Sequence, residues 1–203
     1  MAPATLAGME FSEVMRHRRM IRAYEDRPVP EAHVDRILRN GLRAPSAGFS
    51  QGWAFLVITE PDDRARSFSA AGVPGTGPAS GLSGAPVVIV ALSHKDAYLD
   101  RYAQPDKGWT DRSEQHWPVA YWDIDASFAA LLMHLTAIDL GLGTCFAGIL
   151  PEHIPAFKEA FGVPEPYHPV GYVTAGYPAD DVRSPSLRRG HRAVEEVVHR
   201  GRW

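Results

Sequence analysis

Residues 86–92 read Pro-Val-Val-Ile-Val-Ala-Leu (PVVIVAL), and this continuous apolar run decides the class of fold. A strand with one wet face alternates apolar and polar side chains, so a run without alternation predicts a strand covered on both faces. Two other stretches, 53–59 (WAFLVIT) and 169–177 (PVGYVTAGY), are rich in β-forming residues and also predict strands.

Helical patterns separate these strands without a regular strand–helix–strand repeat. Helices are predicted from Phe11 to the basic run at Arg16, from Glu31, over Pro61 to Ala71, from a cap at Asp123 or Asp125 through Leu140, and over Pro151 to Phe161. The mixture predicts an α+β fold rather than a doubly wound parallel sheet.

The composition is that of an ordinary globular chain. With 203 residues, 45% of them hydrophobic, the length predicts a single domain over residues 1–203. The net charge of −3 offers no positive field to nucleic acid or to a membrane surface. One cysteine, Cys145, excludes an intrachain disulfide and fits a reducing compartment. Without a signal-peptide pattern or a run of roughly 20 apolar residues, a cytoplasmic protein is expected.

One motif points to a hydrolase. Gly48-Phe49-Ser50-Gln51-Gly52 matches the G-x-S-x-G nucleophile elbow. That elbow needs a strand before it and a helix after it, whereas here a predicted helix precedes and a predicted strand follows. A hydrolase with Ser50 as nucleophile is therefore only an alternative. The nine histidines are dispersed without ligand spacing, so no metal site is predicted.

Arginines gather near both ends of the chain. They are Arg16, Arg18, Arg19 and Arg22 near the N-terminus, and Arg188, Arg189 and Arg192 near the C-terminus. Guanidinium groups bind phosphate bidentately and stay charged at any working pH. A phosphate would fit between the clusters if the fold brings the ends together. The alternative, which composition alone favours, is a solvated charged face.

Several motifs in order make the chain resemble the FMN-dependent nitroreductase family. They are 18–22 (RRMIR), 44–53 (APSAGFSQGW), 141–146 (GLGTCF), 176–178 (GYP) and 195–199 (EEVVH). The resemblance runs from about Phe11 to the C-terminus. It implies a central, mainly antiparallel sheet flanked by helices, in an intertwined homodimer with two flavin sites at its interface. It also implies FMN as cofactor, NAD(P)H as electron donor, and a small electron-poor substrate such as a nitroaromatic or a quinone.

The resemblance also assigns roles to residues. The first basic motif would hold the FMN phosphate and pyrimidine side with Arg18, Arg19, Met20 and Arg22. A loop of the other subunit would cover the flavin with Pro45, Ser46, Ala47 and Phe49. Phe146, Ala147, Gly148 and Ile149 would pass the reactive edge of the isoalloxazine and offer backbone groups. A late basic residue, Arg189 or else Arg188, would complete the phosphate site. No catalytic side chain is implied, because the flavin carries the chemistry.

The chain departs from the family pattern at three positions. Met20 replaces a serine, Phe49 replaces an asparagine, and Gly52 replaces a proline. The Met20 N–H could still donate a hydrogen bond, although the serine hydroxyl is lost. Phe49 cannot hydrogen-bond the flavin but could pack against it or shape the substrate pocket.

An aromatic insert spans residues 98–122. It carries Tyr98, Tyr102, Trp109, Trp117, Tyr121 and Trp122. We expect either a lid, in which Trp109 and Trp117 select flat substrates, or a surface for dimer packing. Two other functions stay open for the chain: a deazaflavin-linked oxidoreductase of the same fold, and a non-catalytic flavin-binding or storage protein.

Overall fold

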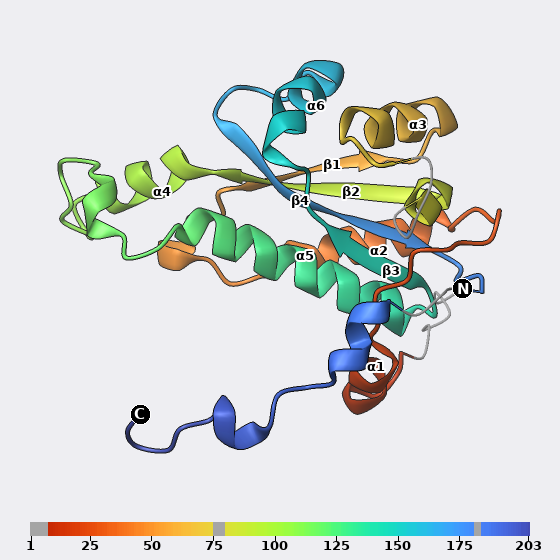
Figure 1. The fold of residues 1–203 in the computed structure, drawn as a ribbon. Coiled ribbons are helices and arrows are strands. Elements are labelled where there is room, and N and C mark those ends of the chain that lie inside the picture. The colour runs from red at the N-terminus through yellow and green to blue at the C-terminus, as the bar shows by residue number, and fades with distance from the viewer. Residues whose placement is uncertain (1–7, 75–79, 181–183) are drawn as a thin grey trace, which may run out of the picture.

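The computed structural model describes residues 8–74, 80–180 and 184–203, with an antiparallel four-stranded sheet at the centre (Figure 1). The strands are β1 (Trp53–Ile58), β2 (Val87–His94), β3 (Gly143–Ala147) and β4 (Tyr167–Gly176). Their order across the sheet is β1-β2-β4-β3, so β1 and β3 form opposite edges.

Helices cover both faces of this sheet, which confirms the predicted α+β fold. They are α1 (Phe11–His17), α2 (Glu31–Gly41), α3 (Pro61–Ala70), α4 (Lys95–Tyr102), α5 (Tyr121–Asp139) and α6 (Ile154–Phe161). In the described ranges, no helix combines the length and the apolar character that crossing a bilayer requires.

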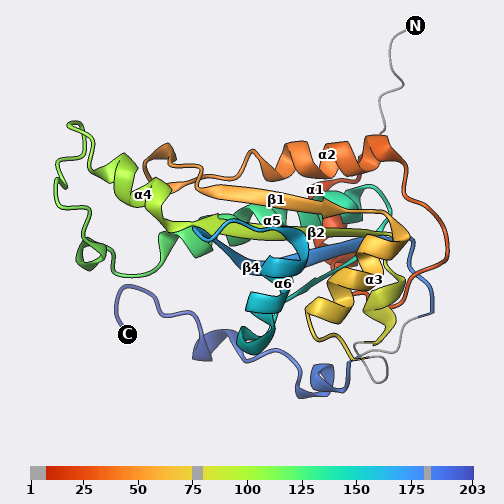
Figure 2. The ribbon, with the colours of Figure 1, turned by 90° about the horizontal axis from the view of Figure 1, so that it is seen from above.

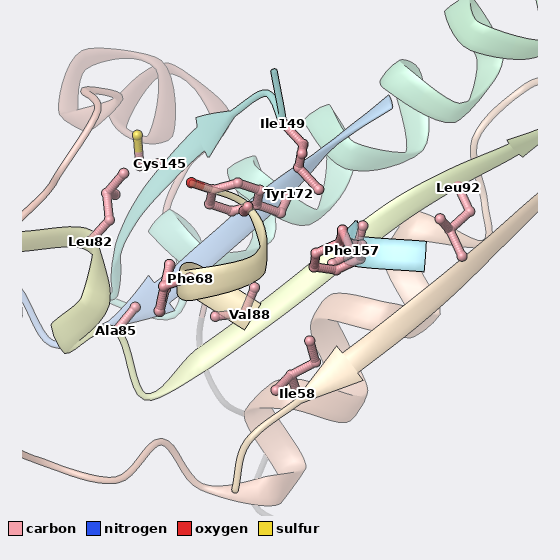
Figure 3. Close-up of a cluster of buried hydrophobic side chains, with 12 residues drawn as sticks. Ile58, Phe68, Leu82, Ala85, Val88, Leu92, Cys145, Ile149, Phe157 and Tyr172 are labelled. Carbon is pink, nitrogen blue, oxygen red and sulfur yellow. The ribbon is translucent and has the colours of Figure 1, made fainter. Parts of the chain in front are cut away.

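The run 86–92 forms most of β2, whose side chains alternate between two cores. On one face, Val88 and Val90 join the cluster drawn in Figure 3, which also contains side chains of α3 and α6. On the other face, Val87 and Ile89 join a cluster with α2 and α5. A strand that is buried on both sides has no polar positions, which explains the continuous apolar sequence.

Helix α5 begins at Tyr121, before either residue that the sequence predicts as its cap. The carboxylates of the two expected caps have tertiary partners instead. Asp123 accepts a hydrogen bond from the Ser93 hydroxyl at 2.6 Å. Asp125 accepts one from the Tyr98 hydroxyl at 2.9 Å. The capping prediction is therefore wrong, because these carboxylates serve buried hydroxyl groups rather than the amides of their own helix.

Neither α4 nor β3 is predicted by the local sequence patterns. Strand β3 has only five residues and opens with Gly143, a weak β-former. It is a strand because it pairs with β4 along its whole length. Long-range pairing thus decides its conformation where local propensity does not.

The C-terminal residues 184–203 lie outside the body of the molecule (Figures 1 and 2). Residues 185–203 are all exposed and form two short 3₁₀ turns, η5 (Pro185–Arg189) and η6 (Val194–Glu196). Figure 2 shows this tail running along the outside of the molecule. The tail therefore has little contact with the rest of the described chain.

Candidate cofactor site

The basic segment 18–22 lies along the free edge of β3. Met20 forms a parallel bridge with Thr144, and the Ile21 amide donates to the Thr144 carbonyl at 2.9 Å. Ile21 is buried and anchors the segment, while the Tyr24 hydroxyl donates to the Ile21 carbonyl at 2.7 Å. Arg18, Arg19 and Met20 stay exposed as a result. The sheet edge thus presents cationic side chains to whatever approaches it.

A cavity of about 240 Å³ lies between this segment and α5. Its lining residues are Arg18, Met20, Phe146, Ser127, Ala130, Leu131 and His134. Three of the residues that the resemblance assigns to the flavin, Arg18, Met20 and Phe146, therefore meet at one place. The Phe146 amide lies 3.4 Å from the Met20 sulfur and donates to it.

His134 at this cavity is missed by sequence reasoning, which treats each lone histidine as a surface or locally bonded residue. Its side chain is buried, and its Nδ1 lies 3.3 Å from the Thr144 hydroxyl. Its Nε2 is buried without a hydrogen-bond partner among the described residues. Such an atom carries a desolvation cost that a bound polar group would relieve.

Burial, and then the charge of Arg18, lower the pKa of His134 from 6.5 to about 4. The imidazole is therefore neutral at physiological pH. In a neutral imidazole one ring nitrogen carries hydrogen and the other does not. If Nδ1 donates to the Thr144 hydroxyl, Nε2 is an acceptor, and if Nδ1 accepts from that hydroxyl, Nε2 is a donor. The cavity lining thus combines the neutral imidazole of His134 with the guanidinium group of Arg18.

This pKa predicts acid sensitivity of the fold. The unfolded chain binds a proton at His134 near pH 6.5, but the folded chain binds it only near pH 4. Stability is therefore complete above about pH 6.5 and falls toward pH 4, by about 3 kcal/mol. The free energy of unfolding is measured by urea denaturation at several pH values in this range. In His134→Leu it should not show the decrease that comes from protonation of His134. An equal loss in the variant would contradict the assignment, and His168→Leu, at an exposed histidine of β4, serves as control.

The segment after β3 presents backbone to solvent. A Cβ added at Gly148 would meet nothing within 4 Å, and the residue is exposed. Ile149, in contrast, is buried in the core cluster of Figure 3, and Ala147 packs against that cluster. Of the four residues expected near the flavin here, Phe146 thus lines the cavity and Gly148 offers open backbone.

The covering loop lies at the opposite edge of the sheet. Pro45, Ser46, Ala47 and Phe49 precede β1, whereas the basic segment lies beside β3. One subunit therefore does not bring these two groups of residues together. The Ser50 hydroxyl donates to the Ala47 carbonyl at 2.6 Å, and the loop leads into a strand instead of leaving one. This geometry is not that of a nucleophile elbow.

Arg188 and Arg189 lie in η5 on the exposed tail. In Figure 1 the tail crosses in front of α1, but Figure 2 shows that the two are separated in depth. Arg192, further along, pairs with Glu196 at 3.1 Å. Arg188 and Arg189 therefore lie on a tail that is separated from α1 (Figure 2).

The aromatic insert forms a small core of its own. Trp117 lies at its centre, and its ring contacts Tyr98, Tyr102, Trp109, Tyr121 and Trp122. Ion pairs surround these rings, among them Arg101–Asp106 at 2.7 Å and Arg112–Asp100 at 2.8 Å. Figure 1 shows the insert projecting from the body beyond α4. Trp109 and Trp117 therefore pack mainly against other rings of the insert.

Known proteins resemble this chain over most of its length. The model of the nitroreductase family matches residues 15–177. A protein of Methanothermobacter thermautotrophicus, named as a candidate NADH dehydrogenase/NAD(P)H nitroreductase, is 28% identical over 198 residues, which cover 96% of this chain and 88% of that protein. A protein of Archaeoglobus fulgidus with the same name is 29% identical, over 92% of this chain and 94% of that protein.

Solved structures share the fold. Bacillus megaterium NfrA2 superimposes with a TM-score of 0.76 at 21% identity, covering 96% of this chain and 76% of that one. A Clostridium difficile protein described as an FMN-dependent nitroreductase gives a TM-score of 0.67 at 24% identity, with 94% and 98% coverage. At these identities the likeness shows the fold alone, and it confirms the fold that the sequence motifs imply.

Proposed function

Because the chain belongs to the nitroreductase family, we propose that it is an FMN-dependent oxidoreductase that reduces nitroaromatics, quinones or similar electron-poor molecules with NAD(P)H. The chemistry that bound FMN would supply is two-electron hydride transfer from NAD(P)H to the second substrate, in a ping-pong cycle. One observation carries the proposal: the basic segment, the cavity at Phe146 and the open backbone of Gly148 follow one another along β3. We place this activity in the cytoplasm, which the single cysteine suits.

The residues beside β3 suit the phosphate and the ring of FMN. The exposed guanidinium of Arg18 suits the phosphate, and Arg19 and Arg22 add positive charge to the same segment. The buried Nε2 of His134 would gain a partner from a polar group of the cofactor. Gly148 lacks a side chain, so a planar ring could reach the backbone amides there. These amides would then stabilise negative charge that develops on the ring.

The rest of the site comes from a second subunit, in an intertwined homodimer. Helix α5 exposes Phe128 (44%) and Leu131 (48%), and the tail exposes Leu187 (67%) and Trp203 (99%). Exposed apolar surface of this extent on a helix face and a tail marks a protein–protein contact. The covering loop lies far from the basic segment of its own subunit, and a partner would supply that loop. The tail of the second subunit would carry a late arginine, Arg189 or else Arg188, to the phosphate.

Removal of the tail should therefore break both the dimer and the site. A chain that ends at residue 184 should elute as a monomer and bind FMN at least about tenfold more weakly, since it loses a charge-assisted contact. The full chain should have about twice its monomer mass of 22.3 kDa in light scattering. A full chain that is monomeric while holding FMN would contradict the shared site.

Steady-state kinetics test the proposed reaction. Initial rates with NADH or NADPH against menadione or nitrofurazone should give parallel double-reciprocal plots, because both substrates use one site in turn. Intersecting plots would contradict that shared site. Turnover with a reduced deazaflavin but with neither nicotinamide would favour the deazaflavin-linked alternative. FMN binding without turnover of any donor would favour the storage protein.

A further inference from the structure

The loop of residues 45–51 carries an apolar ring in an unusual backbone conformation. Phe49 is 75% exposed, with a φ of 56°, in the left-handed region that favours glycine. Gly48 (61°) and Gln51 (49°) also have positive φ. Conformations of this kind persist only where surrounding contacts fix them. The contacts around this loop therefore decide where Phe49 points.

A buried carboxylate is the main contact. Asp125 is 3% exposed, and its Oδ2 accepts hydrogen bonds from the Ala47 amide at 2.8 Å and the Tyr98 hydroxyl at 2.9 Å. A carboxylate buried to this degree needs such donors. Burial, followed by the bond to Asp125, holds the pKa of Tyr98 well above its ordinary value of 10.0, so the hydroxyl stays a donor.

Helix α4 packs directly against the loop. The Arg101 Nε donates to the Gly48 carbonyl at 2.9 Å. A Cβ at Gly48 would lie 2.6 Å from the Tyr102 ring, and one at Gly52 would lie 2.5 Å from the Tyr98 ring. The loop backbone therefore touches α4 directly. Through Tyr98 and Asp125, the loop, α4 and the start of α5 form one unit.

We propose that Asp125 is a positioning residue that fixes this loop so that Phe49 is presented to the flavin and substrate site of the second subunit. This inference rests on the proposed function. The loop lies on the sheet edge opposite its own basic segment. Asp125 also lies on α5, the helix that exposes Phe128 and Leu131 toward a partner. Phe49 would form an apolar wall for flat substrates. Asp125 would not touch the substrate and would affect the site only by positioning Phe49.

Hydrogen exchange of the protein without added flavin tests the fixing of the loop. In Asp125→Asn, an uncharged amide oxygen replaces the carboxylate oxygen that accepts from both the Ala47 N–H and the Tyr98 hydroxyl, so both bonds lose their charge assistance. Exchange in residues 45–52 should become about tenfold faster, the equivalent of one lost hydrogen bond. Asp123→Asn is the matched control, because that carboxylate accepts from Ser93. Unchanged exchange in Asp125→Asn would overturn the proposal.

A double-mutant cycle in the FMN-loaded enzyme tests the route through Phe49. Asp125→Asn and Phe49→Ala should each raise the KM for menadione about tenfold with little change in kcat, and the double variant should show no further rise. Asp123→Asn should stay within about twofold. Effects that multiply to about a hundredfold would overturn the proposal, because the two residues would then act independently.

A third variant tests the proposal even if Asp125→Asn does not fold. Tyr98→Phe keeps the ring and removes one donor to Asp125, so it should shift loop exchange and KM in the same directions by about threefold. No shift in either would overturn the proposal. A wild-type chain that does not bind FMN would overturn the proposed function instead, and the exchange result would still decide whether Asp125 fixes the loop.

Discussion

Gly148→Val is expected to abolish tight FMN binding while leaving the apoprotein folded. A Cβ at this exposed position would meet nothing within 4 Å in the chain, so we expect the fold to tolerate the added side chain. The same side chain would occupy the space through which the flavin ring reaches the backbone. A clash that costs about 3 kcal/mol raises the Kd for FMN roughly 100-fold. Quenching of flavin fluorescence measures this Kd, and thermal melting of the apoprotein reports on the fold.

A size series and a matched site make this experiment decisive. Gly148→Ala should weaken binding less than Gly148→Val, because a methyl group fills less of the space. Ala156→Val adds similar apolar bulk at an exposed position of α6, away from β3, and should leave the Kd unchanged. If Gly148→Val binds FMN as tightly as the wild type, the flavin does not approach the backbone after β3.

Arg18→Ala should weaken FMN binding by about 10- to 100-fold, since a hydrogen bond to a charged group contributes about 1.5–3 kcal/mol. Arg18 is exposed and lines the cavity, so its charge is available to a bound anion. Affinity for riboflavin, which lacks the phosphate, should change by less than about twofold. The ratio of the two Kd values therefore isolates the contact between Arg18 and phosphate.

Arg16→Ala is the control for this loss of charge. Arg16 lies on α1 and pairs with Glu13, so its removal should leave both Kd values as they are. Equal weakening of FMN and riboflavin by Arg18→Ala would place Arg18 beside the ring or the ribityl chain instead. No weakening of either would remove Arg18 from the site.

Much of the fold follows from local patterns in the sequence. The run 86–92 is continuous because β2 is buried on both faces, and the helix predicted from Glu31 begins at that residue. The failures have one physical cause. Strand β3 exists through pairing with β4, and Asp123 and Asp125 serve hydroxyl groups about 30 residues away in sequence. Local propensity carries no information about such partners.

The candidate site divides in the same way. The motif containing Arg18 and Met20 and the one containing Phe146 meet at one cavity, as their shared family resemblance implies. His134 could not be found from a motif, because a lone histidine in an apolar helix has no sequence partner. The partner of His134 is Thr144, ten residues later in the sequence, and folding alone brings the Thr144 hydroxyl beside the imidazole. The contribution of the second subunit stays a prediction.

Anaerobic titration of the purified protein tests the central claim most directly. The absorbance spectrum is recorded after FMN is added and excess is removed, and NADH or NADPH is then titrated in. We predict one FMN per chain, and loss of its visible absorbance with about one equivalent of at least one of the two donors. A protein that retains no FMN, or whose bound FMN keeps its absorbance with both donors, would contradict an FMN-dependent NAD(P)H oxidoreductase.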